Sequence, residues 1–223
     1  TEMIARNIGF EQAWKIFLEE NRLEEANVRD LVRVYVYDSA QYLLSFGENS
    51  GLTKTFRGNE VRSLSSVNAA TCGRMTKMLA KRMADYVHDD GRLTYSYWPS
   101  RGTEGRGNNM IRQFMGTLCL FKMAEYYHSP VYRQLAEHNL KFNMNNYFRG
   151  EGELGLVYEG DKVKLGAIAL AGLSVMESTE KKYLRQLYAA TLHLWRNDGA
   201  FRTFYAPAER NDNQNFYPGE ALL

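Results

Sequence analysis

The chain has 223 residues, of which 44% are hydrophobic and 24% charged, a composition typical of a globular protein with a substantial core. Its formal net charge of +2, with no run of Lys or Arg, gives no sign of a nucleic-acid partner. No apolar stretch approaches the ~18 residues that a membrane-spanning helix needs. Cys72 and Cys119 lie in apolar helical patterns, which predicts buried thiols rather than a disulfide framework.

The first 62 residues are predicted to form a small segment with both helix and strand, the end of a separate domain. Residues 8–20 carry apolar side chains at helical spacing. Residues 32–37 and 41–46 are rich in β-branched and aromatic residues, which indicates strands, and we expect a third strand over 52–58. The starting residues do not resemble a signal peptide, but a cleaved one would leave no trace, so the compartment stays open.

The remainder of the chain is dominated by helical patterns in which apolar and amphipathic helices alternate after a first helix over 65–88. Residues 110–121 and 166–176 are apolar nearly all round, which is typical of helices buried on several sides. Residues 131–147 and 179–195 each keep a polar face. We therefore expect the first pair to be buried and the second pair to be half exposed.

A glycine turn, a short aromatic-rich extended piece and a new apolar helix follow one another three times. The turns are Asp89-Asp90-Gly91, Gly150-Glu151-Gly152 and Asn197-Asp198-Gly199, a spacing of roughly 50–60 residues that is typical of helical-hairpin arrays. In the second copy, Gly160-Asp161 is a hairpin-turn dipeptide between alternating residues. It predicts that residues 156–159 pair with residues 162–164.

Three strings in this part resemble a known family. They are NNMIRQFMGTLCLFKMAEYY, KLGAIALAGLSVME and NQNFYPGEALL, and they resemble bacterial proteins of the six-hairpin, or α/α-toroid, glycosidase-like superfamily. The resemblance implies a mainly α fold over residues 63–223, an α/α-toroid made of helical hairpins, with short β-hairpins at one end and a small β-containing segment over residues 1–62. A ring of six hairpins needs about 300 residues. We therefore expect an incomplete array, truncated at its C-terminus.

The same superfamily houses glycosidases, polysaccharide lyases and uronyl epimerases. The resemblance thus implies a carbohydrate ligand, an acidic bacterial polysaccharide, and further domains or subunits of the same system as partners. In such an array the N-terminal ends of the apolar helices meet on one face, where their partial positive charge favours an anionic ligand. Arginine suits a sugar carboxylate, and aromatic rings suit the sugar face. The candidate substrate-binding residues are Tyr95, Tyr97, Arg106, Arg112, Lys164, Asn215 and Tyr217.

Glu159, Asp161 and Glu220 are the candidate catalytic carboxylates. A glycosidase needs two carboxylates across the scissile bond, whereas a lyase or epimerase needs a base beside a cation that neutralises the substrate carboxylate. Both sets of residue types are present, and the sequence does not choose between them. Structural roles compete: Arg112 as a tie between hairpins, Glu220 as a helix-terminal charge, and Glu159-Gly160-Asp161 as a plain turn.

Two function classes follow. We favour a carbohydrate-active enzyme of the glycosidase, lyase or epimerase kind; the alternative is a non-catalytic scaffold or a glycan- or peptide-binding module of a larger assembly. We expect no cofactor. We also expect no metal, because His88, His128, His138 and His193 lack the H-x-x-x-H or C-x-x-C companions of a zinc site. Under either class, we expect five residues to converge on one concave face: Arg106, Arg112, Glu159, Lys164 and Tyr217.

Overall fold

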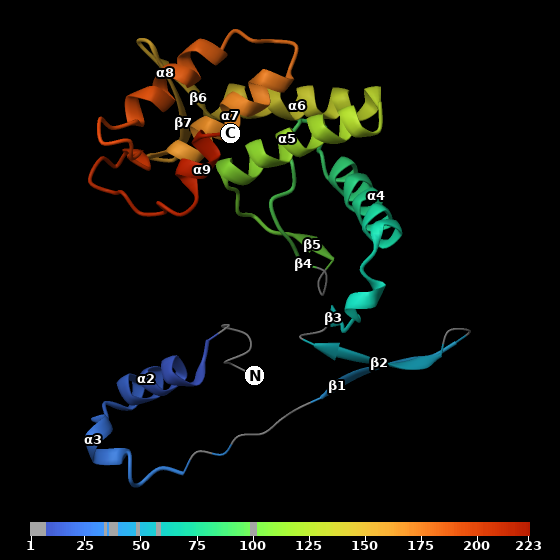
Figure 1. Cartoon of the computed structure of the whole chain (residues 1–223), viewed down its shortest axis with the longest axis vertical. Coiled ribbons are helices and arrows are strands. Elements are labelled where there is room, and N and C mark those ends of the chain that lie inside the picture. The colour runs from blue at the N-terminus through green and yellow to red at the C-terminus, as the bar shows by residue number, and fades with distance from the viewer. Residues whose placement is uncertain (1–7, 34, 36–39, 48–49, 57–58, 99–101) are drawn as a thin grey trace. The chain divides into compact units, whose positions relative to one another are not determined.

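A computed structural model describes most of the chain, and its elements are drawn in Figure 1. These residues form two compact units, 1–71 and 72–223, and each unit is treated by itself. The boundary falls inside a helix, whereas the sequence predicts that the domains meet after residue 62. The described residues are 8–33, 35, 40–47, 50–56, 59–98 and 102–223.

The first unit contains helices and a small antiparallel sheet of order β1-β2-β3. Helix α2 matches the helix predicted over 8–20, and it ends where Arg22 takes a left-handed backbone with φ of 53°. Strands β1 and β2 match the predicted second and third strands, although residues 57–58 lie outside the described residues. The elements are α2 (Phe10–Asn21), α3 (Glu25–Val28), β1 (Gln41–Ser45), β2 (Gly51–Phe56), β3 (Asn59–Glu60) and the 3₁₀ turn Leu64–Ser66.

The strand predicted over 32–37 is not present in its described part. Residues 32, 33 and 35 are not in a strand, and residues 34, 36 and 37 lie outside the described residues. The backbone N–H groups of Leu31 and Val32 instead donate to the carbonyl of Val28, at 3.0 and 3.1 Å. Residues 31 and 32 therefore continue the turn that follows α3, which overrides their β propensity.

The second unit contains the remaining helices and two further sheets. The larger sheet is antiparallel with strand order β6-β7-β8-β9, and the smaller is the pair β4-β5. The helices are α4 (Ala69–Asp85), α5 (Met110–Tyr126), α6 (Pro130–Tyr147), α7 (Leu165–Glu177), α8 (Leu184–Leu194) and α9 (Tyr217–Ala221). The strands are β4 (Tyr97–Trp98), β5 (Thr103–Glu104), β6 (Phe148–Glu151), β7 (Leu154–Glu159), β8 (Lys162–Lys164) and β9 (Phe204–Ala206).

The prediction of a mainly α, α/α-toroid fold is wrong. In the part of the chain that the structure describes there are eight helices, with 49% helix and 18% strand and several small antiparallel sheets, which is a mixed α/β architecture. The physical reason lies in the β6–β9 sheet. Its side chains Leu156, Val157 and Val163 are at most 1% exposed, so the extended pieces are part of the core rather than short hairpins at one end of a helical ring.

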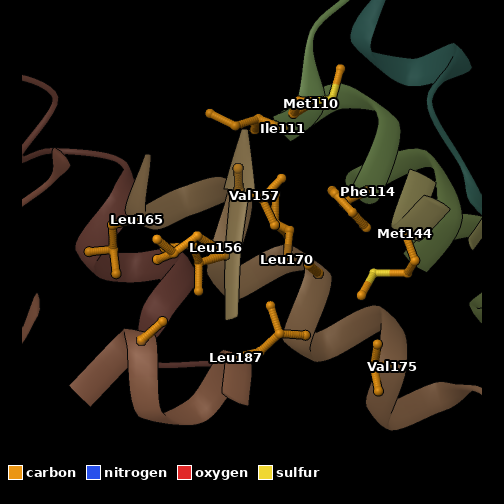
Figure 2. Packing of buried hydrophobic residues seen from close by; sticks show 14 of the residues in the cluster. Met110, Ile111, Phe114, Met144, Leu156, Val157, Leu165, Leu170, Val175 and Leu187 are labelled. Carbon is orange, nitrogen blue, oxygen red and sulfur yellow. The ribbon is translucent and has the colours of Figure 1, made fainter. Parts of the chain in front are cut away.

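The predicted alternation of buried and half-exposed helices is confirmed. In α5 and α7, Phe114 and Ile168 are fully buried, and Leu170 is 3% exposed. Lys181 and Arg185, in the stretch predicted to be amphipathic, are exposed. Figure 2 shows the resulting core, in which side chains of α5, α6, β7, α7 and α8 meet.

Helix α4 departs from its predicted packing. The predicted apolar face of the 65–88 helix includes Met75, Met78 and Leu79, which are 56–66% exposed, and Ala80 is the buried residue of α4. The thiols predicted to be buried are also exposed. Cys72 lies on this same helix, and Cys119 lies on α5. Among the described residues, no helix has both the length and the apolarity to cross a membrane.

Each of the three predicted glycine turns has a glycine with positive φ: 92° at Gly91, 60° at Gly152 and 83° at Gly199. Such a backbone suits glycine because it has no Cβ. The second copy opens into the β6–β7 hairpin. The β7–β8 pairing predicted around Gly160-Asp161 is confirmed, with Tyr158 opposite Val163 and Glu159 opposite Lys162.

The first and third copies of the glycine turn adopt the same local structure. Since the second copy is a β-hairpin, we call the first copy (residues 86–94) the first turn and the third copy (residues 194–202) the second turn. In the first turn, the His88 N–H donates to the Arg92 carbonyl at 2.8 Å; in the second, the Arg196 N–H donates to the Ala200 carbonyl at the same distance. An aspartate closes each turn, since Asp90 and Asp198 accept from the backbone N–H two residues on, at 2.9 and 3.1 Å.

Candidate functional site

A hollow of about 360 Å³ opens where the end of α6, the β7–β8 turn and the residues before α5 meet. We call it the polar hollow. Helix packing brings these segments together, since α5 lies against α6 and β7 contacts both helices. It is lined by Asn108, Met110, Asn146, Tyr147, Arg149, Tyr158, Glu159 and Gly160.

The Tyr147 hydroxyl is held at one side of the polar hollow. Its oxygen accepts a hydrogen bond of 2.8 Å from the amide nitrogen of Asn108, which precedes α5. Burial raises the pKa of Tyr147, and the hydrogen bond from Asn108 opposes this effect. Tyr147 is therefore a neutral phenol at neutral pH.

Arg149 of β6 and Tyr158 of β7 are in side-chain contact, although Arg149 is directly opposite Leu156 in the strand register. The Arg149 guanidinium carbon is 4.6 Å from the centre of the Tyr158 ring, a cation–π contact. The Tyr158 hydroxyl donates to the Glu151 carboxylate, and this bond raises the pKa of Tyr158 to about 12. The Tyr158 ring is thus held by the backbone at one end and by the Glu151 carboxylate at the other. This limits the positions that the stacked Arg149 guanidinium can take.

Glu159 and Lys164 form an ion pair across the β7–β8 hairpin, between Glu159 Oε2 and Lys164 Nζ. Their side chains are 25% and 14% exposed. Lys164 is also the residue that precedes the first turn of α7. Asp161 lies exposed in the turn between the two strands. Of the three predicted carboxylates, Glu159 is therefore partly buried and Asp161, two residues away, is open to solvent.

Glu220 and Tyr217 pack on the first turn of α7. A Cβ added at Gly166 would lie 2.8 Å from Tyr217 Cδ1 and would overlap Glu220 Oε2, so this glycine permits the close approach. Glu220 Oε2 is buried without a hydrogen-bond partner among the described residues. Burial raises the pKa of Glu220, and the positive charge of Arg112 opposes it. Burial also raises the pKa of Tyr217, helped by the negative charges of Glu220, Asp212 and Glu159.

Of the predicted residues, Glu159, Lys164, Tyr217 and Glu220 thus lie around the start of α7, and Arg112 acts on Glu220 through its charge. The other predicted residues lie elsewhere in the second unit. Tyr97 packs edge-on against Tyr86, with ring centres 5.6 Å apart, and Tyr95 is 44% exposed on the same segment. Arg106 and Asn215 are exposed in loops.

Five polar lining residues of the polar hollow are absent from the predicted site residues: Asn108, Tyr158, Asn146, Tyr147 and Arg149. One signal points to the last three of these in retrospect. The end of α6 reads NMNNYFR, and asparagine is a poor helix former because its side chain competes for backbone hydrogen bonds. Such a run at the end of a regular helix indicates polar groups retained for contacts outside the helix.

A second polar group surrounds His88, whose Nε2 is 3.2 Å from Glu104 Oε2 and 3.0 Å from an Arg92 nitrogen. All three side chains are about one-third exposed. Within the described ranges, no group of three or more His, Cys, Asp or Glu side chains is arranged to hold a metal ion.

No family model, curated protein or solved structure matches the chain. The resemblance to the six-hairpin superfamily therefore stays a resemblance of three strings. The function is therefore inferred from the geometry of the polar hollow itself.

Proposed function

We propose that the polar hollow binds an acidic saccharide. One observation carries the proposal: amide groups of Asn108 and Asn146, a phenol, a guanidinium and a carboxylate converge on a single hollow. Sugar hydroxyls both donate and accept hydrogen bonds, so they are matched by such a mixed set of groups. Its volume of about 360 Å³ lies within the range typical of small-ligand sites.

Arg149 is the cation that we assign to the ligand carboxylate. Its planar guanidinium presents paired N–H groups that match both carboxylate oxygens. The stacking on the Tyr158 ring holds the guanidinium in place before the ligand arrives. Lys164, one of the three cations predicted from the sequence, is instead paired with Glu159, and this pairing makes it a weaker candidate for the carboxylate.

Glu159 is assigned to the sugar hydroxyls. Its Oε2 pairs with Lys164, so Oε1 can accept a hydroxyl proton. Asn146 supplies a further acceptor, because its amide nitrogen donates to the Phe142 carbonyl at 2.8 Å and its oxygen points to the other side of the amide. These groups would select the hydroxyl pattern of the sugar, while Arg149 would select its charge.

A second candidate function is catalytic, and Glu220 favours it. A carboxyl group whose pKa is raised by burial keeps its proton closer to neutral pH, as a general acid must. Glu220, however, lines a groove between α7, α8 and α9, whereas Glu159 lines the polar hollow. Because two cooperating carboxylates would have to face one bound sugar, we favour binding over turnover.

Calorimetric titration with tetragalacturonate, an acidic oligosaccharide, and with maltotetraose, a neutral one, tests the proposal. Arg149→Ala should weaken tetragalacturonate binding at least ~10-fold, the effect of losing a charged hydrogen bond, and should leave maltotetraose nearly unaffected. Added salt should also weaken binding of the acidic ligand. The matched control is Arg185→Ala, since Arg185 is 90% exposed and makes a long 3.8 Å pair with Glu153.

Two results would decide against parts of this proposal. Equal affinity of the wild type and Arg149→Ala for tetragalacturonate would remove the assigned site. Chromatographic detection of shortened or unsaturated products with the wild type, lost in Glu220→Gln, would replace simple binding by the catalytic candidate.

A further inference from the structure

We infer that Tyr147 presents its hydroxyl proton, and not an oxygen lone pair, to the ligand in the polar hollow. Asn108 and Gln113 are the positioning residues that impose this direction. The nature of the ligand rests on the proposed function. The direction of the hydrogen bond rests on contacts among side chains and backbone of the second unit.

The chain of contacts begins at the backbone of Leu93, in the first turn. The Leu93 N–H donates to Gln113 Oε1 at 3.2 Å, and Gln113 Nε2 donates to the Leu93 carbonyl at 2.6 Å. A backbone N–H can only donate and a carbonyl can only accept. The side-chain amide of Gln113, which is 1% exposed, therefore has one possible orientation.

This orientation determines that of Asn108. Gln113 Nε2 lies 2.9 Å from Asn108 Oδ1, and the backbone N–H of Asn109 lies 2.9 Å from the same atom. Both neighbours are donors, so the atom between them has to be the amide oxygen. The other end of the Asn108 amide, which faces Tyr147 at 2.8 Å, is therefore the nitrogen.

The Asn108 nitrogen can only donate, so the Tyr147 oxygen accepts and the phenolic proton is left for another partner. Among the described residues no side chain accepts that proton. Since Tyr147 lines the polar hollow, a bound ligand meets a hydrogen-bond donor at this point. Burial, with the negative charges of Asp90 and Glu159, raises the pKa of Tyr147 and keeps the proton in place.

The consequence is a specificity rule for this subsite. A ligand atom that faces Tyr147 has to be an acceptor, such as a carboxylate, hydroxyl or ring oxygen. The ammonium group of an amino sugar has donors only, and it would leave the phenolic proton unpaired. The subsite should therefore reject an amino sugar in this position and accept a uronic acid.

Asn108→Asp tests the direction of the bond, because it replaces the donor by a carboxylate oxygen. The Tyr147 hydroxyl should then turn and donate to the introduced carboxylate. Asn108 is exposed, so the substitution should be tolerated. Asn146→Asp is the matched control, since it adds the same charge to the same hollow while the Asn146 amide contacts Phe142 and not Tyr147.

The readout is the Raman doublet of tyrosine, whose intensity ratio reports whether the phenol accepts or donates. Subtracting the spectrum of Tyr147→Phe isolates this tyrosine. We expect an acceptor-dominated phenol in the wild type and in Asn146→Asp, and a donor in Asn108→Asp. A donor signature in the wild type would overturn the inference, whatever the ligand.

Binding provides the second readout. Tyr147→Phe should weaken tetragalacturonate binding roughly fivefold in the wild type, the effect of one neutral hydrogen bond. The same substitution should have little further effect in Asn108→Asp. Unchanged affinity in Tyr147→Phe, where Arg149→Ala does weaken binding, would exclude Tyr147 as a ligand contact. If the wild type does not bind tetragalacturonate, the proposed function fails, and the Raman comparison still decides the direction of the bond.

Discussion

The first and second turns have the same backbone structure but differ in the burial of the side chains that anchor them. In the first turn, the Gly91 carbonyl accepts a hydrogen bond of 2.7 Å from Asn139 Nδ2, and Asn139 is fully buried in α6. In the second turn, the Phe201 carbonyl accepts a hydrogen bond of 3.0 Å from Nε2 of Gln214, an exposed loop residue. Local sequence is therefore sufficient to specify this turn, whereas the packing around it determines how strongly it is held.

The difference extends to the helix that follows each turn. The fourth residue of α5 is Gln113, and that of α9 is Glu220. Gln113 uses both ends of its amide on the Leu93 backbone and Asn108, whereas one oxygen of Glu220 is buried without a partner among the described residues. The first turn is therefore tied to a buried polar network, in which Asn143 Oδ1 is the atom without a partner among the described residues, whereas in α9 the unpaired oxygen belongs to the residue at the position of Gln113 itself.

The largest difference should appear when alanine replaces the glycine of each turn. Both glycines have a positive φ, which costs ~1–2 kcal/mol for a residue with a Cβ. At Gly91 the added Cβ would also lie 2.7 Å from the His138 carbonyl oxygen, whereas nothing lies within 4 Å at Gly199. We expect Gly91→Ala to lower the free energy of unfolding by about 3 kcal/mol or more, and Gly199→Ala by ~1–2 kcal/mol.

Urea denaturation of the two variants measures this difference. Equal losses of unfolding free energy would mean that the close packing of the first turn on α6 contributes nothing, and the comparison between the turns would fail at that point.

The anchoring side chains should show a smaller contrast. Asn139→Ala removes the side-chain partner of the Gly91 carbonyl and one of the partners of the Thr117 hydroxyl and of the Asn143 amide. Leaving buried polar groups unpaired should cost about 2–3 kcal/mol. Gln214→Ala exposes its partner to water and should cost less than ~1 kcal/mol. Thermal unfolding followed by circular dichroism provides the values, and a loss in Gln214→Ala as large as that in Asn139→Ala would contradict the buried-network interpretation.

The smallest effect should come from Glu220 and should depend on pH. Burial raises the pKa of Glu220 above its ordinary value of 4.5. As pH rises through 4.5, the unfolded chain loses its proton first, so this group lowers the free energy of unfolding until pH passes its folded pKa. Glu220→Gln should therefore be more stable than the wild type at pH 7, by less than ~1 kcal/mol because the side chain is partly solvated.

That gain should disappear below about pH 4, where the carboxyl group is protonated in both states. Denaturation curves across this pH range test it, with Glu153→Gln as the control, since Glu153 is 89% exposed. A gain that persists at low pH would show that something other than ionisation of Glu220 is responsible.

The turns were predictable from sequence because everything that defines them is local. Asp90 and Asp198 each close their own turn, and the adjacent glycine supplies the positive φ. The Glu159–Lys164 pair is also local, since its members are five residues apart on one hairpin. The contact between Asn108 and Tyr147 spans 39 residues and exists only because α5 packs on α6, so no local pattern reveals it.

The toroid prediction failed for a related reason. Apolar and amphipathic periodicity correctly predicts which helices are buried, but it does not say what covers them. Strand β7 supplies Leu156 and Val157 to the core that α7 and α8 share. A short extended piece between two helices has the same sequence pattern whether it ends as a surface hairpin or as part of a buried sheet.

The ring of Trp195 stacks on Phe201 across the neck of the second turn, with centres 6.0 Å apart and planes inclined by 17°. Val87 and Leu93 are the residues bridged at the same place in the first turn, so only the second turn carries a tryptophan there. In a protein with Trp14 and Trp98 replaced by phenylalanine, tryptophan emission, excited selectively over that of the 15 tyrosines, would arise from Trp195 alone. Such a protein would signal the opening of the weakly anchored turn separately from the unfolding of the whole unit.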